Sequence, residues 1–311
     1  MSNKIKTSYN TQVVRKKLKK YKKSSHQLGF ISIFVILFAV LGLFVFYQSR
    51  RIPELGEESQ ITMLPQEMLS VLGTKTGPQL FEKQERVPVF LYHYIEYVKD
   101  DPGRQKLTVP PNIFISQIET LKNAGYTFIT PNDLMDDLLG KTKLPEKLVI
   151  LTFDDGYMDF YTDVFPILKK ENVKGVAYIV PDFLNRPNYM FTFQLKEVAK
   201  SPLVEIGAHT MNHVWLKGIS KATAKYEISQ SKKSLADMLH LSINSFAYPY
   251  GALDQQAVDL VKNAGYTNAV STIPGIVQTE QNKFFLYRLR PGYRRGEELI
   301  KFLSQKDFQP W

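Results

Sequence analysis

Two adjacent carboxylates stand in the segment Thr152–Gly156 (TFDDG), directly after the apolar run 147–151. A strand over 147–153 would carry both acids, Asp154 and Asp155, to the rim of a sheet, where α/β enzymes place their chemistry. An Asp-Gly pair is also a common turn or helix cap. The acids alone therefore do not decide between a reactive site and an ordinary turn.

Two histidines, His209 and His213, follow a second apolar run, 203–208. Residues four apart lie on one face of a helical turn, so we expect such a turn to point both imidazoles at one ion. With an aspartate they form a set that suits Zn²⁺ or another borderline divalent ion and leaves coordination positions open for water and substrate. The chain has only five histidines, so this spacing favours a metal site over a purely structural role.

The order of three motifs, TFDDG, HTMNH and Phe246–Gly251 (FAYPYG), resembles the NodB-type polysaccharide deacetylases, from about residue 87 to about residue 291. The resemblance implies a distorted (β/α) barrel and a metal-dependent enzyme that removes N-acetyl groups from N-acetylglucosamine polymers. It further implies that Asp155, His209 and His213 bind the metal and that Asp154 is the general base. The implied cofactor is a divalent metal, with Zn preferred and Ni, Co, Fe or Mn as alternatives.

This chain departs from the commoner family pattern at two places. Ala247 and Tyr248 stand where most members have an arginine, and no histidine follows His240 to act as the general acid that most members carry near the C-terminus. The candidate first strand, 87–94, instead ends with His93 and Tyr94, which resembles the subgroup with the acid motif at the front of the domain. That subgroup includes the biofilm poly-N-acetylglucosamine deacetylases. We therefore predict that His93 is the general acid; a histidine with only a hydrogen-bonding role is the alternative.

Two further roles need residues. Tyr250 matches the family position whose backbone N–H helps hold the oxyanion, a role that is compatible with an ordinary turn. An arginine must orient Asp154, and the alternating segment 286–291 places Arg288 and Arg290 on one face of a strand. We name Arg290 as the candidate catalytic arginine and leave open which of the two supports Asp154, and whether both are surface arginines of an edge strand.

Aromatic residues near the motifs are candidates for stacking on sugar rings. We name Tyr157 and Trp215 as candidate substrate-binding residues, and the implied partner is an acetylated amino-sugar polysaccharide. Aromatic residues make up 13% of the chain, so most of them are expected in the core.

Apolar runs alternate with amphipathic stretches from residue 87 onward. This alternation predicts the α/β class with a parallel, barrel-like sheet, and about 225 residues suffice for one core. We expect strands at 127–129, 147–153, 175–180, 204–207, 245–248 and 268–271, and helices at 111–124, 131–139, 160–171, 222–239 and 254–264.

The N-terminal part of the chain predicts a membrane anchor. Residues 28–47 form an uncharged stretch of twenty positions, enough at about 1.5 Å per residue to cross about 30 Å of hydrocarbon. Residues 1–27 hold nine Lys and Arg and no acid, so the positive-inside bias places this basic tail in the cytoplasm. We expect an extracytoplasmic stalk at 48–86 and a catalytic domain at 87–311 on the bacterial cell surface. A cleaved signal peptide is the rival interpretation, although the chain lacks a small-x-small cleavage site at 45–49.

The net charge of +10 does not indicate a nucleic-acid partner. Apart from the nine Lys and Arg residues of the tail, the chain has 31 Lys and Arg residues and 30 Asp and Glu residues. The catalytic part is therefore nearly neutral. The chain has no cysteine, which excludes disulfides and thiolate ligands and suits an extracytoplasmic bacterial protein.

Three functions fit these observations. The first is an anchored N-deacetylase that acts on poly-N-acetylglucosamine or on the peptidoglycan glycan strand. The second is an esterase that removes O-acetyl groups, as from xylan, with the same metal apparatus. The third is a glycan-binding module that has kept the fold without activity. The full set of Asp154, Asp155, His209, His213 and His93 argues against the third.

Overall fold

The computed structural model of the chain describes residues 83–97 and 101–309, which belong to one compact unit, 63–311. The predicted cytoplasmic tail (1–27) and transmembrane helix (28–47), and the predicted stalk up to residue 82, lie outside the described residues. Over the ranges that are described, none of the helices has the length and apolar character needed to cross a bilayer.

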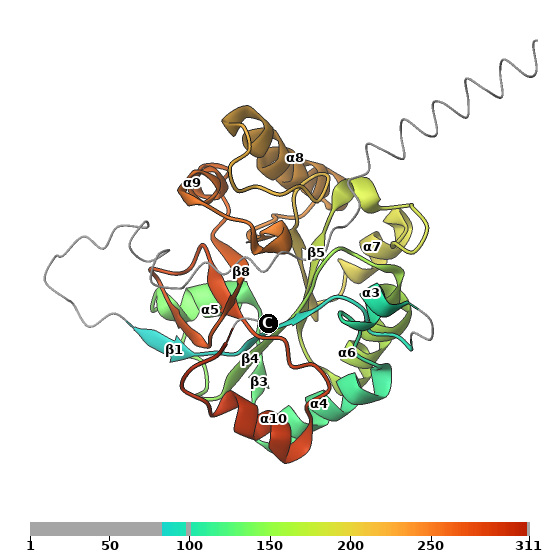
Figure 1. Cartoon of the computed structure of the whole chain (residues 1–311), viewed down its shortest axis with the longest axis vertical. Coiled ribbons are helices and arrows are strands. Elements are labelled where there is room, and N and C mark those ends of the chain that lie inside the picture. The colour runs from blue at the N-terminus through green and yellow to red at the C-terminus, as the bar shows by residue number, and fades with distance from the viewer. Residues whose placement is uncertain (1–82, 98–100, 310–311) are drawn as a thin grey trace, which may run out of the picture. The chain divides into compact units, whose positions relative to one another are not determined.

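Strands and helices alternate along most of the described chain (Figure 1). The strands are β1 (Gln84–Arg86), β2 (Val89–Tyr92), β3 (Thr127–Phe128), β4 (Leu148–Phe153), β5 (Gly175–Ile179), β6 (Val204–Ala208), β7 (Ser245–Ala247), β8 (Asn268–Pro274), β9 (Val277–Thr279) and β10 (Leu286–Arg288). The helices are α3 (Pro102–Gln105), α4 (Pro111–Asn123), α5 (Pro131–Leu138), α6 (Phe165–Glu171), α7 (Thr192–Val198), α8 (Lys221–Leu239), α9 (Gln255–Asn263) and α10 (Gly296–Leu303). A π-helical turn, Phe160–Val164, precedes α6, and two 3₁₀ turns lie at Pro181–Phe183 and Pro249–Gly251.

The main sheet is parallel and nearly closed. Its strands follow the order β10-β8-β7-β6-β5-β4-β2, with the short β3 paired to the first half of β4. Backbone hydrogen bonds from Leu91 to the carbonyl of Leu289 and from Leu289 to the carbonyl of Val89, 2.9 and 2.8 Å long, join β2 to the chain just after β10. Helices surround this sheet in Figure 1. The predicted α/β barrel is therefore confirmed.

Strand β4 shows how the sequence produces the barrel. All six of its residues, LVILTF, are buried, because a strand inside a helix-covered barrel has no face toward water. Leu148 and Ile150 belong to the cluster inside the barrel, which helix α5 closes with Leu134, Met135 and Leu138. The alternate residues Val149, Leu151 and Phe153 pack in the larger cluster with the surrounding helices. Both faces of β4 thus anchor the loop that follows it.

The predicted elements are present with end shifts of a few residues. The sequence did not predict the helices α3, α7 and α10, or the antiparallel pair of β1 with β9. Because β1 covers Gln84–Arg86, the sheets begin before residue 87, where the sequence predicts the start of the catalytic domain. Short edge strands such as these carry too few residues for a periodic pattern.

The carboxyl group of Glu205, in β6, makes stability depend on pH, since its Oε1 is buried. Burial raises the pKa of Glu205 to about 7, although Thr130 and the backbone of Asn132 at the start of α5 partly oppose the shift. The stability that this group contributes is therefore present below the ordinary pKa of 4.5 and is lost as pH rises through 7.

We expect Glu205→Gln, which resembles the protonated acid, to unfold like the unmodified protein at pH 4. At pH 8 the variant should be more stable by about 1–3 kcal/mol. Urea unfolding at the two pH values measures the difference. An equal effect of the substitution at both pH values would contradict the assignment.

Candidate metal centre and active site

Asp154 lies just beyond the end of β4 and is held by a buried arginine from β10. Arg288 donates from its two terminal nitrogens to the two carboxylate oxygens of Asp154, both at 2.8 Å. The Nε of Arg288 donates to the carbonyl of Ser271 at 2.6 Å, and its side chain is fully buried. This paired geometry fixes the orientation of the carboxylate.

The arginine also determines the charge of Asp154. Burial, the largest influence, raises the pKa of this carboxyl group. The guanidinium of Arg288, the nearby His209 and the hydrogen bonds from Arg288 outweigh burial, so the pKa lies below the ordinary value of 3.8. Asp154 is therefore ionised near neutral pH and can accept a proton.

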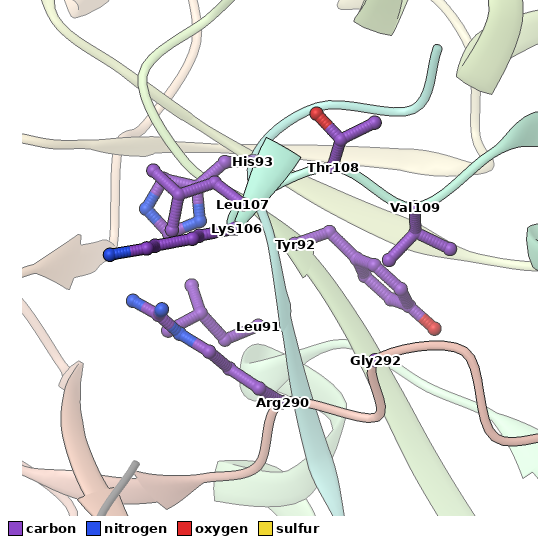
Figure 2. Close-up of a pocket in the computed structure, with 9 residues that line it drawn as sticks. All are labelled: Leu91, Tyr92, His93, Lys106, Leu107, Thr108, Val109, Arg290 and Gly292. Carbon is purple, nitrogen blue, oxygen red and sulfur yellow. The ribbon is translucent and has the colours of Figure 1, made fainter. Parts of the chain in front are cut away.

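Of the two candidate arginines, Arg288 rather than Arg290 supports Asp154, which corrects our choice of Arg290. The reason is the register of β10. Arg288 is the last residue of the strand and its side chain reaches Asp154 inside the barrel. Arg290 lies two residues beyond the strand end and lines a pocket beside His93 (Figure 2).

Asp155, His209 and His213 converge as the sequence predicts. One donor atom from each lies within 4.8 Å of the others. The Oδ1 of Asp155 is 3.4 Å from Nε2 of His209 and 3.1 Å from Nε2 of His213. Asp155 and His209 are buried, whereas His213 is partly exposed. The three donors therefore surround one small space that is reached from the side of His213.

The donor atoms of this trio fit a bound cation. Nδ1 of His209 lies 2.8 Å from the carbonyl of Ala247, so it carries the proton and leaves Nε2 with a lone pair. Oδ1 of Asp155 is buried and has no hydrogen-bond partner. Oδ1 of Asp155 lies 3.4 and 3.1 Å from Nε2 of His209 and of His213. A divalent cation bound between these atoms would be attracted to all three of them. Burial raises the pKa of Asp155, but hydrogen bonds from the protonated rings of His209 and His213 outweigh it and lower the pKa well below its ordinary range, so the carboxylate is ionised and a cation can take the place of the ring protons.

The two histidines do not lie on a helical turn, which corrects our expectation. His209 directly follows β6, and the residues up to His213 form a non-helical turn. Thr210 and His213 have φ angles of 58° and 56°, in the left-handed region that residues other than glycine rarely adopt. Asp155 and Tyr250 also have positive φ, 75° and 58°. Strained backbone gathered in one place is typical of a functional site.

The sheet register places His93 beside the carboxylates. Tyr92 of β2 pairs with Phe153 of β4, and the N–H of Asp154 donates to the carbonyl of Tyr92 at 3.0 Å. His93 is partly buried and lines a pocket of about 40 Å³. In Figure 2 the side chains of His93, Lys106 and Arg290 extend toward the same side of that pocket. Burial lowers the pKa of His93 to about 4, against the opposite effect of Asp155 and Asp154.

Aromatic side chains surround the trio. The ring of Tyr157 lies 4.0 Å from that of Tyr94 and 4.9 Å from that of Tyr189, measured between centroids. The hydroxyl of Tyr250 lies 3.0 Å from Nδ1 of His213. The ring of Trp215 is 5.9 Å from the ring of Tyr250, and both are more than a third exposed.

Comparison with known proteins agrees with this geometry. The sequence profile of the polysaccharide deacetylase family matches residues 141–269, a range that includes both metal-ligand motifs and the FAYPYG motif. The protein YxkH of Bacillus subtilis (strain 168), named for the same family, is 30% identical over 209 residues, which cover 67% of this chain and 72% of YxkH.

Two further relatives are similar over comparable ranges. The poly-beta-1,6-N-acetyl-D-glucosamine N-deacetylase of Staphylococcus aureus (strain N315) is 27% identical over 225 residues, 68% of this chain and 77% of that protein. The structure of the Streptococcus pyogenes deacetylase PplD in complex with acetate has a TM-score of 0.66 and 26% identity, and covers 72% of this chain and all of that one. The chain therefore belongs to the NodB-type polysaccharide deacetylase family, as its three motifs predict.

Proposed function

We propose that this protein is a metal-dependent hydrolase that removes N-acetyl groups from an extracellular polysaccharide containing N-acetylglucosamine, either poly-N-acetylglucosamine or peptidoglycan. The observation that carries the proposal is the convergence of the Asp154–Arg288 pair, the three metal-ligand candidates and His93 at one edge of the barrel. The name of the S. aureus relative supports an N-acetylated amino-sugar polymer as the substrate class.

Asp155, His209 and His213 would hold the divalent metal, with Zn²⁺ as our first choice and Ni, Co, Fe or Mn as alternatives. A cation bound there supplies Lewis-acid polarisation of the acetyl carbonyl and makes water more acidic. The carbonyl of Ala247 fixes the tautomer of His209, so that its Nε2 faces Asp155, and the contact of Tyr250 with Nδ1 of His213 leaves Nε2 of that ring facing Asp155 as well.

Asp154 is the proposed general base. It is ionised, and Arg288 holds both of its oxygens in place, so it can take a proton from the attacking water without losing its orientation. Its low pKa limits its strength as a base. The developing negative charge on the substrate, close to the same carboxylate, increases its proton affinity during the reaction.

His93 is the proposed general acid for the departing sugar amine. With a pKa of about 4, its imidazole is neutral near pH 7 before the reaction. The proton that it gives to nitrogen must therefore reach it within the substrate complex: Asp154 takes this proton from the attacking water and passes it to His93, since the negative charge of the tetrahedral species raises the proton affinity of the nearby imidazole. A neutral imidazole beside Asp154 is suited to receiving and passing on such a proton.

The remaining predicted residues hold the substrate in this proposal. The backbone N–H of Tyr250, in the turn Pro249–Gly251, would donate to the oxyanion. Trp215 and Tyr157 have partly exposed rings that would stack on a sugar chain. The uncharged segment 28–47 would anchor this activity to the outer face of the cell membrane.

Loss of the arginine pair should shift the pH dependence of the reaction. In Arg288→Gln, burial of Asp154 is no longer opposed by a guanidinium, so its pKa rises and the base is protonated over a wider range. We expect the acid limb of the kcat/KM profile to move to higher pH by about 1–3 units. Arg290→Gln is the matched control and should leave that limb in place. A shift in the control but not in Arg288→Gln would show that the arginine roles are reversed.

Acetate release by the full chain tests the proposed function. Poly-N-acetylglucosamine, peptidoglycan and acetylxylan are supplied in parallel, and the proposal expects release from at least one of the two N-acetylated polymers and none from acetylxylan. Release from acetylxylan alone would instead identify an O-acetyl esterase.

A further inference from the structure

A carboxylate from helix α8 holds the turn that joins the two metal-binding histidines. Glu227 is 5% exposed. Its Oε2 accepts the backbone N–H groups of Met211 and Asn212 at 3.0 and 2.9 Å, and its Oε1 accepts from the side-chain amide of Asn212 at 3.1 Å. Met211 and Asn212 lie between His209 and His213, so all of these bonds end on the segment that spaces the ligands.

The turn needs an external support of this kind. Thr210 and His213 adopt left-handed backbone angles, which a side chain makes unfavourable. Two consecutive N–H groups that point at one place form a concave anion site, and Glu227 supplies the anion. With that carboxylate in place, the turn keeps the conformation that presents both rings to Asp155.

The two histidines depend on this support to different degrees. The backbone N–H of His209 donates to the carbonyl of Ile179 at 2.9 Å, so the sheet fixes the first ligand. His213 lies at the far end of the turn and is partly exposed. Helix α8 is itself fixed, since Ala224, Ile228 and Leu235 are buried in the core. Glu227 therefore transmits the rigidity of α8 to His213.

We propose that Glu227 is a positioning residue that sets the metal affinity of the Asp155–His209–His213 site. This inference rests on the proposed metal-dependent function. Glu227 acts through the turn and not as a ligand, because both of its oxygens are engaged by Met211 and Asn212. Partners that orient metal ligands typically change metal affinity by about 10–100-fold when they are removed.

The test measures Zn²⁺ affinity of the full chain by competition with a chelator, together with the melting temperature. Glu227→Ala should weaken Zn²⁺ binding by about 10–100-fold. Glu227→Gln should bind nearly as well as the unmodified chain, since its amide oxygen can accept both N–H groups and its NH₂ can face a turned Asn212 amide. Leu235→Ala, a buried change in the same helix away from the turn, should lower the melting temperature and leave the affinity unchanged.

Unchanged Zn²⁺ affinity in Glu227→Ala would overturn this inference and leave the proposed function unaffected. Equal weakening in Leu235→Ala would overturn it as well, because a general loss of stability would then explain the effect. Weakening of the same size in Glu227→Gln would show that charge matters and positioning does not. Absence of Zn²⁺ binding by the unmodified chain would overturn the proposed function and the inference together.

Discussion

His209→Ala should remove bound divalent metal and acetate release together. His209 is the most deeply placed of the three ligand candidates, at 1% exposed, and its ring is oriented by the carbonyl of Ala247. The variant leaves two protein ligands, and a site with two of its three ligands should lose most of its affinity. We expect no measurable turnover at micromolar metal. Metal content by elemental analysis and acetate release on the same preparation measure the effect.

His240→Ala is the matched control for this variant. His240 is exposed and caps the C-terminal end of α8 with a left-handed backbone, at a φ of 56°. Its loss removes an imidazole without touching the candidate site, so metal content and activity should stay unchanged. Full turnover in metal-free His209→Ala would contradict the metal assignment.

His93→Ala should lower turnover by about 10²–10⁴, the usual effect of losing a positioned acid or base. Metal content and KM should change little, because proton donation to nitrogen matters in the transition state and contributes little to ground-state binding. Steady-state kinetics with metal analysis separate these quantities. Loss of metal together with activity would instead make His93 a ligand.

The pH dependence of the His93→Ala effect tests how the acid obtains its proton. Because burial lowers the pKa of His93 to about 4, the imidazole is neutral throughout the range from pH 6 to pH 8. The turnover rate of the unmodified protein divided by that of His93→Ala should therefore be nearly constant over that range. A ratio that falls about tenfold per pH unit would show that a histidine protonated in advance is required.

The structure also argues against Tyr92 as an alternative proton donor to His93. The hydroxyl of Tyr92 donates to the side chain of Gln117 at 2.8 Å, and its ring packs in the cluster outside the barrel. Tyr92 is therefore directed away from the reacting groups. If turnover in His93→Ala stays near that of the unmodified protein, Tyr250 or solvent becomes the proton donor.

The sequence alone predicts the strands that position the site residues. The apolar run of β4 predicts a buried strand, and a buried parallel strand must deliver Asp154 and Asp155 to the sheet edge. The family motifs then predict the same three ligand candidates that the fold brings together. Residues that follow directly from a strand end are predictable in this way because the strand fixes their position.

The supporting contacts were not predictable from local patterns. Arg288 and Arg290 share a strand face, and only the point at which β10 ends decides that Arg288 reaches Asp154. Spacing of four residues suggested a helical turn for His209 and His213, but the turn has left-handed residues that a carboxylate from another helix holds. Glu227 lies fourteen residues after His213 in a predicted helix, and its charge gave no signal of a tertiary contact. Such long-range pairs depend on packing, which periodicity does not encode.

The most direct test of the central claim is a metal titration of the stripped, full-length protein. Zn²⁺ is added in steps, and bound metal and acetate release from an N-acetylglucosamine polymer are measured on the same samples. The site formed by Asp155, His209 and His213 predicts that activity rises in proportion to occupancy and saturates at one ion per chain. Full activity in the stripped protein, or saturation of the site without any acetate release, would contradict it.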